Sequence, residues 1–350
     1  MSIQDFKNQC REAFKDDIVE MATSSRFSTG SYDVDRGLNK LARGRFHLWV
    51  GRESAGKTSL ATHTARQVNL INWDTGEHDP TLSNPSPVLF VDLEGTFDLN
   101  WAAKIGIPKE SWDNYNYHVQ PASGEVAANI VLTGIESGNF GAIFVDSNEA
   151  FVSIKTIEKA TEQDVMCDRS KILSRMYRVG QSNLIKATNK EKPWRTPTVI
   201  CLNQLRDNIG SLYGGDTIPG GRAQLQYSST ILHFNAPLVK DDTVKAYGMG
   251  TFKGVVKKNK TAPPKKNFSF NMALLDLTDE EGNGLKAGQI DNASSILADI
   301  KSLDLMKKLD KGVEIFGVSY RIQSDFKDAM RNDPEAQRIV WNKLLEIHAA

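Results

Sequence analysis

Cysteine is scarce in this chain, and its scarcity excludes two kinds of framework. The three cysteines, Cys10, Cys167 and Cys201, are scattered and odd in number. They have neither the spacing of a metal site nor the even count of a disulfide scaffold, which fits a reducing cytoplasm. Long apolar runs are also missing, because no segment is long enough to cross a bilayer and the N-terminus lacks a signal-peptide core. We therefore expect a cytoplasmic protein without a membrane partner.

Net charge is absent as well, because 43 basic residues balance 43 acidic ones. The total charge therefore says nothing about partners, but its distribution does. Residues 151–230 hold twelve Lys or Arg against seven Asp or Glu, and residues 252–266 hold six Lys and no acid. Local basic patches on a neutral protein indicate contact with an anionic surface, although a charge run taken alone is more often a solvated face.

What the sequence does contain is a loop of the phosphate-binding form G-x-x-x-x-G-K-[ST]. Its residues are Gly51, Arg52, Glu53, Ser54, Ala55, Gly56, Lys57 and Thr58. A predicted strand at residues 45–50 precedes it, and a predicted helix begins at Ser59. Glycines let backbone N–H groups converge on an anion, and the helix N-terminus adds positive charge. Lys57 would then contact the β- and γ-phosphates of ATP, and Thr58 would ligate Mg²⁺. The alternative is that the segment is a chance glycine-rich turn.

Further apolar runs separated by helical segments predict an α/β fold with a mostly parallel, twisted sheet, buried on both faces. These runs are residues 88–92, 141–146, 198–202 and 230–234. Ligand groups gather at the carboxyl ends of the strands in such a sheet. The phosphate loop and three polar side chains lie at such ends, so we expect them to share one site.

An ATPase needs an acid that holds Mg²⁺ through water, and Asp146 fits because it ends an apolar strand. It needs a group that positions or activates water, and Glu94 fits for the same reason. Gln204 precedes a glycine-rich segment and would sense the γ-phosphate and report it there. Lys258 and Lys260 are candidates for neutralising the transition state, although spacing alone does not place them at the site.

The regions that flank this core suggest three parts. An amphipathic helix is predicted at residues 3–22, and its apolar stripe packs either on the chain's own core or on a neighbouring subunit. A small α/β domain is predicted at the C-terminus, with two helices and a hairpin at residues 294–305, 334–348 and 313–320. The predicted parts are an N-terminal oligomerisation helix, an ATPase core and a small C-terminal domain at residues 1–26, 27–284 and 285–350.

Two segments, at about residues 160–170 and 205–222, are predicted to be flexible loops on the nucleotide side of the sheet. Isolated basic and aromatic residues in glycine-rich loops suit single-stranded nucleic acid, although surface loops have the same composition. A helix predicted at residues 171–185 carries a cationic stripe that suits a phosphate backbone. The alternative is that this stripe is an ordinary exposed helix face. The candidate DNA-binding residues are Met166, Arg169, Lys171, Ser174, Arg178, Arg206, Tyr213, Gly220, Gly221 and Arg222.

These motifs resemble those of the RecA family of homologous-recombination proteins over nearly the whole chain. The phosphate loop is similar to the family's GPESSGKT, and Glu94 matches the catalytic glutamate. Residues 203–206, NQLR, resemble the NQIR that opens the family's second DNA-binding loop, and residues 220–223, GGRA, resemble the GGNA that closes it. Residues 258–260 match the KNK motif, whose two lysines reach the ATP of the neighbouring subunit in a filament.

The resemblance implies that Trp101 stacks on adenine and that catalysis uses Glu94, Lys57, Gln204, Lys258 and Lys260. The implied nucleotide-binding residues are Gly51, Glu53, Ser54, Ala55, Gly56, Lys57, Thr58, Ser59, Trp101 and Asp146. The implied metal ligands are Thr58 and Asp146.

The function that the resemblance implies is a DNA-dependent ATPase that uses ATP and Mg²⁺. It would form helical filaments on single-stranded DNA and exchange strands with homologous double-stranded DNA. A single-strand-binding protein and a recombination mediator are further expected partners. The short chain and the proline-rich stretch before Val88 resemble a phage-encoded recombinase of the UvsX kind, and the first loop lacks the bacterial family's glycine-containing sequence.

Two other functions stay open at this point. One is a ring helicase of the same fold class, but such motors usually place an arginine in the neighbouring site, where this chain has Lys258 and Lys260. The other is a nucleotide-switched mediator that remodels recombination proteins without exchanging strands. Glu94, Gln204 and the two loops together argue against that second alternative.

Overall fold

The structure, a computed structural model, describes most of the chain. It covers Asp5 and residues 25–154, 157, 162–207, 216–235, 248–264, 266–278 and 284–349, with the backbone alone for residues 162–167 and 207. The predicted N-terminal helix, apart from Asp5, lies outside the described residues, as do Tyr213 and the side chain of Met166.

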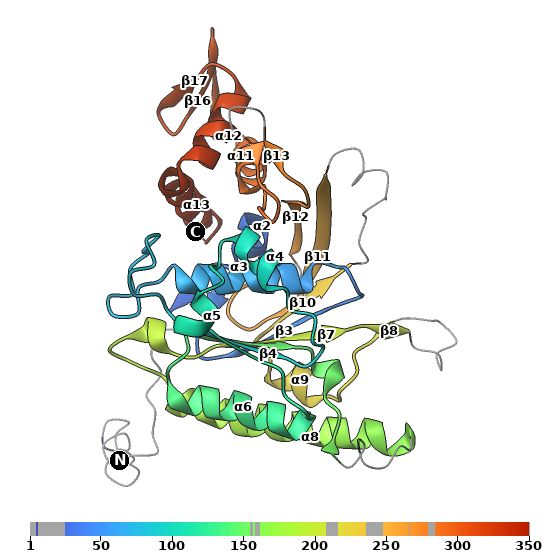
Figure 1. The fold of residues 1–350 in the computed structure, drawn as a ribbon. Helices are drawn as coiled ribbons and strands as arrows, with labels where there is room; N and C mark the ends of the chain where they lie inside the picture. Colours follow the sequence, from blue (N-terminus) through green and yellow to red (C-terminus); the bar gives the residue numbers. More distant parts are fainter. Residues whose placement is uncertain are drawn as a thin grey trace.

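An eight-stranded sheet forms the centre of the fold, with the strand order β12-β11-β10-β3-β7-β6-β4-β5 (Figure 1). The strands from β10 to β5 in this order are parallel, and β11 and β12 are added antiparallel. The strands are β3 (Phe46–Gly51), β4 (Val88–Asp92), β5 (Tyr117–Val119), β6 (Ala142–Asp146), β7 (Val199–Gln204), β10 (Thr230–Phe234), β11 (Met249–Asn259) and β12 (Asn267–Ala273). The predicted α/β fold with a mostly parallel sheet is confirmed.

Helices cover both faces of this sheet (Figure 1). One face carries α2 (Tyr32–Leu38), α3 (Lys57–Asn69), α4 (Leu99–Ile105) and α5 (Ser111–Asn114). The other carries α6 (Gly124–Ser137), α8 (Glu162–Lys186) and α9 (Ala223–Tyr227). Adjacent residues of β3, Leu48 and Trp49, belong to the two different buried clusters, because successive side chains on a strand point to opposite faces. This explains why the strands read as continuous apolar runs.

The prediction of a loop at residues 160–170 is wrong, because α8 is helical from Glu162 onward. The helix predicted at residues 171–185 is one part of this longer helix. No glycine or proline interrupts residues 162–170, so the helix continues through them. A polar composition alone does not distinguish a loop from a helix.

The C-terminal part contains the predicted helices and hairpin, with an additional helix and a third strand. Its elements are α11 (Asn292–Ser302), β15 (Met306–Leu309), β16 (Gly312–Ile315), β17 (Val318–Tyr320), α12 (Gln323–Asn332) and α13 (Pro334–Ala349). Short strand pairs complete the fold, namely β1 (Arg26–Phe27) with β2 (Leu41–Ala42), β8 (Arg206–Asp207) with β9 (Asp216–Thr217), and β13 (Leu277–Thr278) with β14 (Gly284–Leu285). Within the described ranges, no helix combines the length and the apolar character needed to cross a bilayer.

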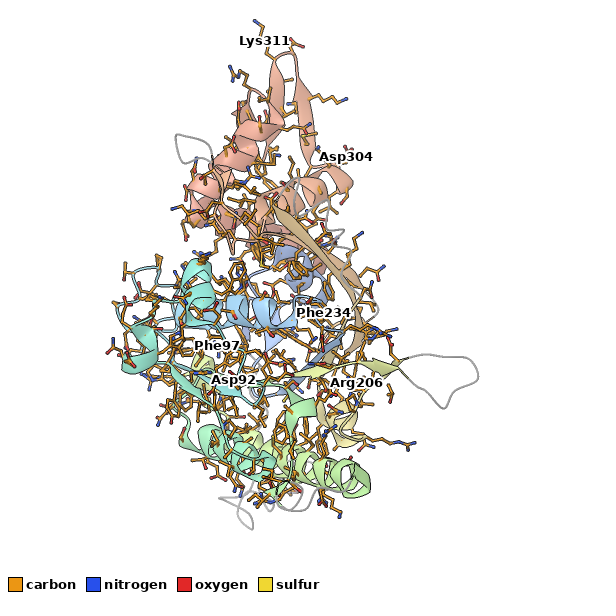
Figure 2. The ribbon with its side chains drawn as sticks, turned by 45° about the vertical axis from the view of Figure 1, so that its right-hand side comes forward. Asp92, Phe97, Arg206, Phe234, Asp304 and Lys311 are labelled. Carbon is orange, nitrogen blue, oxygen red and sulfur yellow. The ribbon has the colours of Figure 1, made fainter. Side chains whose placement is uncertain are left out.

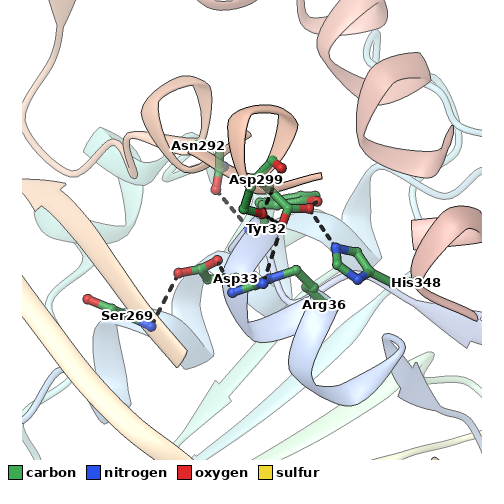
Figure 3. A network of polar contacts seen from close by, with 8 residues as sticks. Tyr32, Asp33, Arg36, Ser269, Asn292, Asp299 and His348 are labelled. Atoms are coloured by element: carbon green, nitrogen blue, oxygen red, sulfur yellow. Dashed lines mark hydrogen bonds and ion pairs between the residues drawn. The ribbon is translucent and has the colours of Figure 1, made fainter. Parts of the chain in front are cut away.

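The C-terminal part shares its hydrophobic cluster with the part of the chain that holds the large sheet. Tyr32 of α2 is fully buried in the cluster formed by α11, α12 and α13. Its ring and that of Trp341 are nearly perpendicular, with their centroids 5.5 Å apart. Its hydroxyl donates to Asp299, which also accepts from His348 Nε2 at 2.7 Å and from Arg36 at 3.3 Å (Figure 3). The C-terminal cluster is therefore completed by a residue from the other end of the chain.

A buried carboxyl in α2 gives a pH-dependent prediction. Asp35 is fully buried and accepts from the Thr29 amide at 2.8 Å and the Thr29 hydroxyl at 2.7 Å. Burial raises its pKa to about 6. The folded protein therefore binds this proton more tightly than the unfolded chain, so the contribution of Asp35 to stability falls as the pH rises from about 4 to about 6.

We expect Asp35→Asn to remove this dependence. The difference in unfolding free energy between variant and wild type should shift toward the variant by roughly 2 kcal/mol between about pH 4 and about pH 7. Urea unfolding at both pH values measures it. Asp310→Asn, at an exposed position, is the matched control. A difference between Asp35→Asn and wild type that does not change with pH would contradict the prediction.

Candidate active site

The phosphate loop joins β3 to α3, and close packing explains both of its glycines. Gly56 has φ 87°, in the left-handed region, and a Cβ there would lie 2.5 Å from the Phe252 ring. Gly51 needs no unusual φ, but its Cβ would lie 2.7 Å from that of Phe234. Strands β10 and β11 therefore support the loop from beneath, which leaves no space for larger residues.

The Lys57 side chain folds back onto the backbone of the phosphate loop. Its Nζ donates to the Gly51 carbonyl at 2.8 Å and to the Arg52 carbonyl at 2.7 Å. Burial lowers the pKa of this amine, while Asp146 and Glu94 oppose the shift. The charge is largely desolvated, and its hydrogen bonds within the described residues go to neutral carbonyl groups. It is therefore well placed to be neutralised by an anion.

Asp146 at the end of β6 faces the first turn of α3. The Thr58 hydroxyl donates to its Oδ2 at 2.8 Å. Burial, helped by the nearby carboxylates of Glu94 and Asp92 and opposed by Thr58 and Lys57, raises the pKa of Asp146 to about 7. A buried carboxylate in such surroundings is suited to a cation.

These two oxygens fit a magnesium site. Over the described part of the chain, no cluster of three or more His, Cys, Asp or Glu side chains is placed to hold a metal. Mg²⁺ usually keeps several waters and takes only one or two protein ligands beside substrate phosphates. Thr58 and Asp146 together supply that number.

Glu94 and Gln204 meet across the strand ends. The Gln204 side-chain amide donates to Glu94 Oε1 at 3.2 Å, and the Ser147 hydroxyl donates to the same oxygen. Gln204 is also the register partner of Gly51, where β7 runs beside β3. The structure thus brings together the phosphate loop, Glu94, Asp146 and Gln204 as the strand pattern predicts.

Asp92 is a site residue to which the sequence assigned no role. It lies buried at the end of β4 (Figure 2). Its carboxylate accepts from the backbone N–H groups of Gly95 at 2.8 Å and Phe97 at 3.1 Å. Burial alone would raise its pKa, but these hydrogen bonds and those from His118 and Gln120 outweigh burial and lower it. Asp92 thereby fixes the turn that carries Glu94.

Three buried amide side chains form a cluster that sequence reasoning missed. Gln224 Oε1 accepts from Asn148 at 3.0 Å and from Asn203 at 2.9 Å, and all three side chains are fully buried. Asn203 and Gln224 also both donate to the Pro219 carbonyl, at 2.9 and 2.5 Å. The available sequence signal is that Asn148 closely follows β6 and Asn203 directly precedes Gln204. We call these three residues the amide cluster.

The amide cluster ties the end of the second predicted DNA segment to the strand ends. Within that segment, residues 208–215 lie outside the described residues. Gly220 and Gly221 have φ of 98° and 84°, and a Cβ on them would lie 2.6 Å from Leu173 and 3.1 Å from Ser170. The end of the second segment therefore packs closely on the first part of α8, where the first segment was predicted.

The cationic candidates lie around this contact. Lys171 and Arg178 are exposed on α8, Arg222 is exposed at the start of α9, and Arg206 lies at the base of the second segment (Figure 2). Some already have partners within the chain. Arg206 pairs with Glu149 at 2.6 Å, Lys171 pairs with Asp168 at 3.2 Å, and half-buried Arg169 donates to the Phe151 carbonyl.

Three other predicted site residues have contacts outside the phosphate loop. Trp101 lies on α4, where Lys104 stands 5.8 Å from its ring centroid. Lys258 donates to the carbonyls of Leu225 at 2.5 Å and Gln226 at 3.2 Å, and Lys260 donates to Gln226 at 3.3 Å. Both lysines thus contact the end of α9.

Comparison with known proteins now gives the family. Residues 13–276 match the family model described as the RecA N-terminal domain. The chain belongs to the RecA family. It is 33% identical to the RecA protein of Chloroherpeton thalassium over 274 residues, covering 75% of this chain and 70% of that protein. It is 32% identical to the RecA protein of Chlorobaculum tepidum over 276 residues, covering 75% of this chain and 72% of that protein. It is 31% identical to the RecA protein of Streptomyces ambofaciens over 319 residues, covering 84% of this chain and 78% of that protein.

The RecA family match covers the whole phosphate loop and the strand ends. It ends at residue 276, before α11, so the C-terminal part lies beyond the matched model. The three named RecA relatives are bacterial proteins and do not bear on the expected phage origin, which stays a prediction.

The amide cluster of this RecA-family chain gives a stability prediction. Gln224→Leu should orphan buried amide hydrogens on Asn148 and Asn203 and lower the free energy of unfolding by about 1–3 kcal/mol. Gln226→Leu, on the exposed side of the same helix, should change it by less than about 0.5 kcal/mol. Denaturant unfolding measures both variants. Equal losses in the two would show that the amide cluster is not a stabilising contact.

Proposed function

We propose that this RecA-family protein is an ATP-dependent DNA recombinase. It would bind ATP and Mg²⁺ in the phosphate loop, assemble into helical filaments on single-stranded DNA and exchange strands with a homologous duplex. The observation that carries the proposal is the contact between Gln204 and Glu94. It joins a candidate catalytic carboxylate to the residue that opens the candidate DNA-binding segment.

The chemistry assigned to the chain's own residues is phosphoryl transfer to water. Lys57 would exchange its carbonyl partners for phosphate oxygens, and Thr58 and Asp146 would hold Mg²⁺, which supplies charge neutralisation at the phosphates. Glu94 would orient and polarise the attacking water, since Ser147 and Gln204 fix its carboxylate. Trp101 would contact the adenine.

Communication with DNA would pass through Gln204 and its neighbour. The Asn203 side-chain oxygen accepts from the Gln204 backbone N–H at 2.9 Å, and the Asn203 amide bonds to Gln224. A shift of Gln204 toward a γ-phosphate would therefore act on both ends of residues 205–222. Two-state elements of this kind convert a small change at a phosphate into a change at a distant surface.

Self-assembly is supported by an edge of the sheet that has no further strand among the described residues. β5 is an edge strand, and its Tyr117 side chain is 53% exposed. Beside it runs a groove of about 460 Å³ with an apolar lining that includes Leu89, Val126, Ile130 and Phe140. An edge strand next to an apolar groove is a template for pairing with another chain. We assign it to a second copy of this protein, while mediator and single-strand-binding partners stay predictions.

The test uses the predicted action of Lys258 and Lys260 on a neighbouring subunit. A Lys258→Ala/Lys260→Ala protein should bind nucleotide through its intact loop but lose DNA-stimulated hydrolysis, because the γ-phosphate charge of its neighbour is no longer met. Glu94→Gln should also bind and hydrolyse slowly. At an interface where one variant supplies Glu94 and the other supplies both lysines, a complete site is rebuilt.

Mixed filaments should therefore regain part of the hydrolysis that neither variant shows alone. ATP turnover on single-stranded DNA, followed across mixing ratios, measures this recovery. Nucleotide affinity and unfolding midpoint of each variant are the controls for folding, since the lysines also bond to α9. If turnover equals the sum of the separate rates at every ratio while co-assembly is confirmed, the lysines do not act between subunits.

A further inference from the structure

A cavity distant from the proposed chemistry lies between the core and the C-terminal part. Its volume is about 330 Å³, within the range of small-molecule pockets. Its walls come from β1, the last turns of α3, residues 71–80, the start of α11 and the first turns of α13. Neither the phosphate loop nor the candidate DNA-binding residues line it.

The lining of this cavity is strongly cationic. It includes Arg26, Lys40, Arg66, His78 and Arg338, and no carboxylate belongs to the described residues that line it. The neighbouring acids are Glu335 and Asp79. Glu335 pairs with Arg338 at 2.9 Å, and Asp79 accepts from the Thr81 and Ser83 amides on its own loop. Among the described residues, a hydrogen-bonded carboxylate thus compensates only Arg338.

The other three strong cations have neutral partners or lack a partner. The Arg26 guanidinium donates to the carbonyls of Asn39 at 2.8 Å and Thr261 at 2.9 Å. The Lys40 ammonium donates to the Asn342 amide oxygen at 2.9 Å. Arg66 Nη1 is buried and has no hydrogen-bond partner among the described residues. A buried guanidinium nitrogen without a hydrogen-bond partner is costly unless a ligand atom accepts from it.

The surroundings of His78 show the same excess of positive charge. Burial lowers its pKa, and Arg338 and Arg66 lower it further, while Glu335 and Asp79 act in the opposite direction. Apolar side chains complete the wall, among them Leu70 and Trp341. A cationic floor with an apolar wall suits a ligand that carries both a charged group and an organic part.

We propose that this cavity binds a phosphorylated small molecule, with the phosphate held by Arg26, Lys40 and Arg66. Guanidinium forks match phosphate oxygens in geometry and in charge. The ligand would touch both the core and α13, so its binding would hold the C-terminal part against the ATPase core. The site is separate from the phosphate loop and does not require ATP.

Calorimetry with inorganic pyrophosphate tests the site. The full chain carries Lys57→Ala, which removes competition from the phosphate loop, and the buffer holds about 0.15 M salt to suppress weak surface attraction. This protein should bind one equivalent. Adding Arg66→Gln should weaken that binding by about tenfold or more. Arg321→Gln, on an exposed ion pair of the C-terminal part, is the matched control and should leave it unchanged.

Folding is checked by thermal unfolding. Without pyrophosphate, Arg66→Gln should unfold no earlier than its parent, because it removes a buried N–H group that has no described partner. Pyrophosphate should raise the midpoint of the parent alone. Lys40→Gln gives a second variant with the same expected loss of binding.

Three results would overturn the proposal. The first is no binding by the Lys57→Ala protein, and the second is equal binding by the Arg66→Gln and Arg321→Gln proteins. The third is displacement of pyrophosphate by a duplex oligonucleotide together with weaker DNA binding by Arg66→Gln, since the cavity would then be part of a DNA-binding path.

Discussion

The hydrogen bond between the Gln204 amide and the Glu94 carboxylate is the contact on which the rest of the site depends. It exists because β7 and β4 belong to one parallel sheet and end at the same edge. Glu94 is positioned from one side by the turn that Asp92 fixes, and Gln204 from the other by its pairing with Gly51. The proposed chemistry and the proposed DNA contact therefore share a single pair of side chains.

Buried polar groups set the character of the molecule around that pair. Asp146 and Lys57 are desolvated charges that suit a cation and an anion, which fits a site built for a metal–phosphate complex. The amide cluster is neutral and internally paired, so it fixes geometry without demanding a ligand. Arg66 differs from both, because its buried Nη1 has no hydrogen-bond partner among the described residues.

The sequence predicted those parts of the fold that depend on local pattern. Apolar runs located the main parallel strands, and the shared edge of a parallel sheet correctly brought Glu94, Asp146 and Gln204 together. β11 was missed because its exposed lysines alternate with buried residues such as Val256, and the whole stretch was read as a charge run. The start of α8 was missed because a polar segment resembles a loop.

Contacts that join distant segments had no local signal. Gln224 meets Asn148 and Asn203 only after two strands and a helix are in place, and no spacing in the chain announces the amide cluster. Tyr32 likewise completes a core that lies more than 250 residues away along the chain, at Ala293 and beyond. Such pairings are set by tertiary packing, which periodicity does not record.

Strand exchange by the purified protein tests the central claim most directly. The protein is incubated with ATP, Mg²⁺, circular single-stranded DNA and a linear duplex, either homologous or unrelated. The account predicts joint molecules and exchanged products that require ATP and homology. DNA-stimulated ATP hydrolysis without joint molecules, or unwinding that is equal for the homologous and the unrelated duplex, would contradict it.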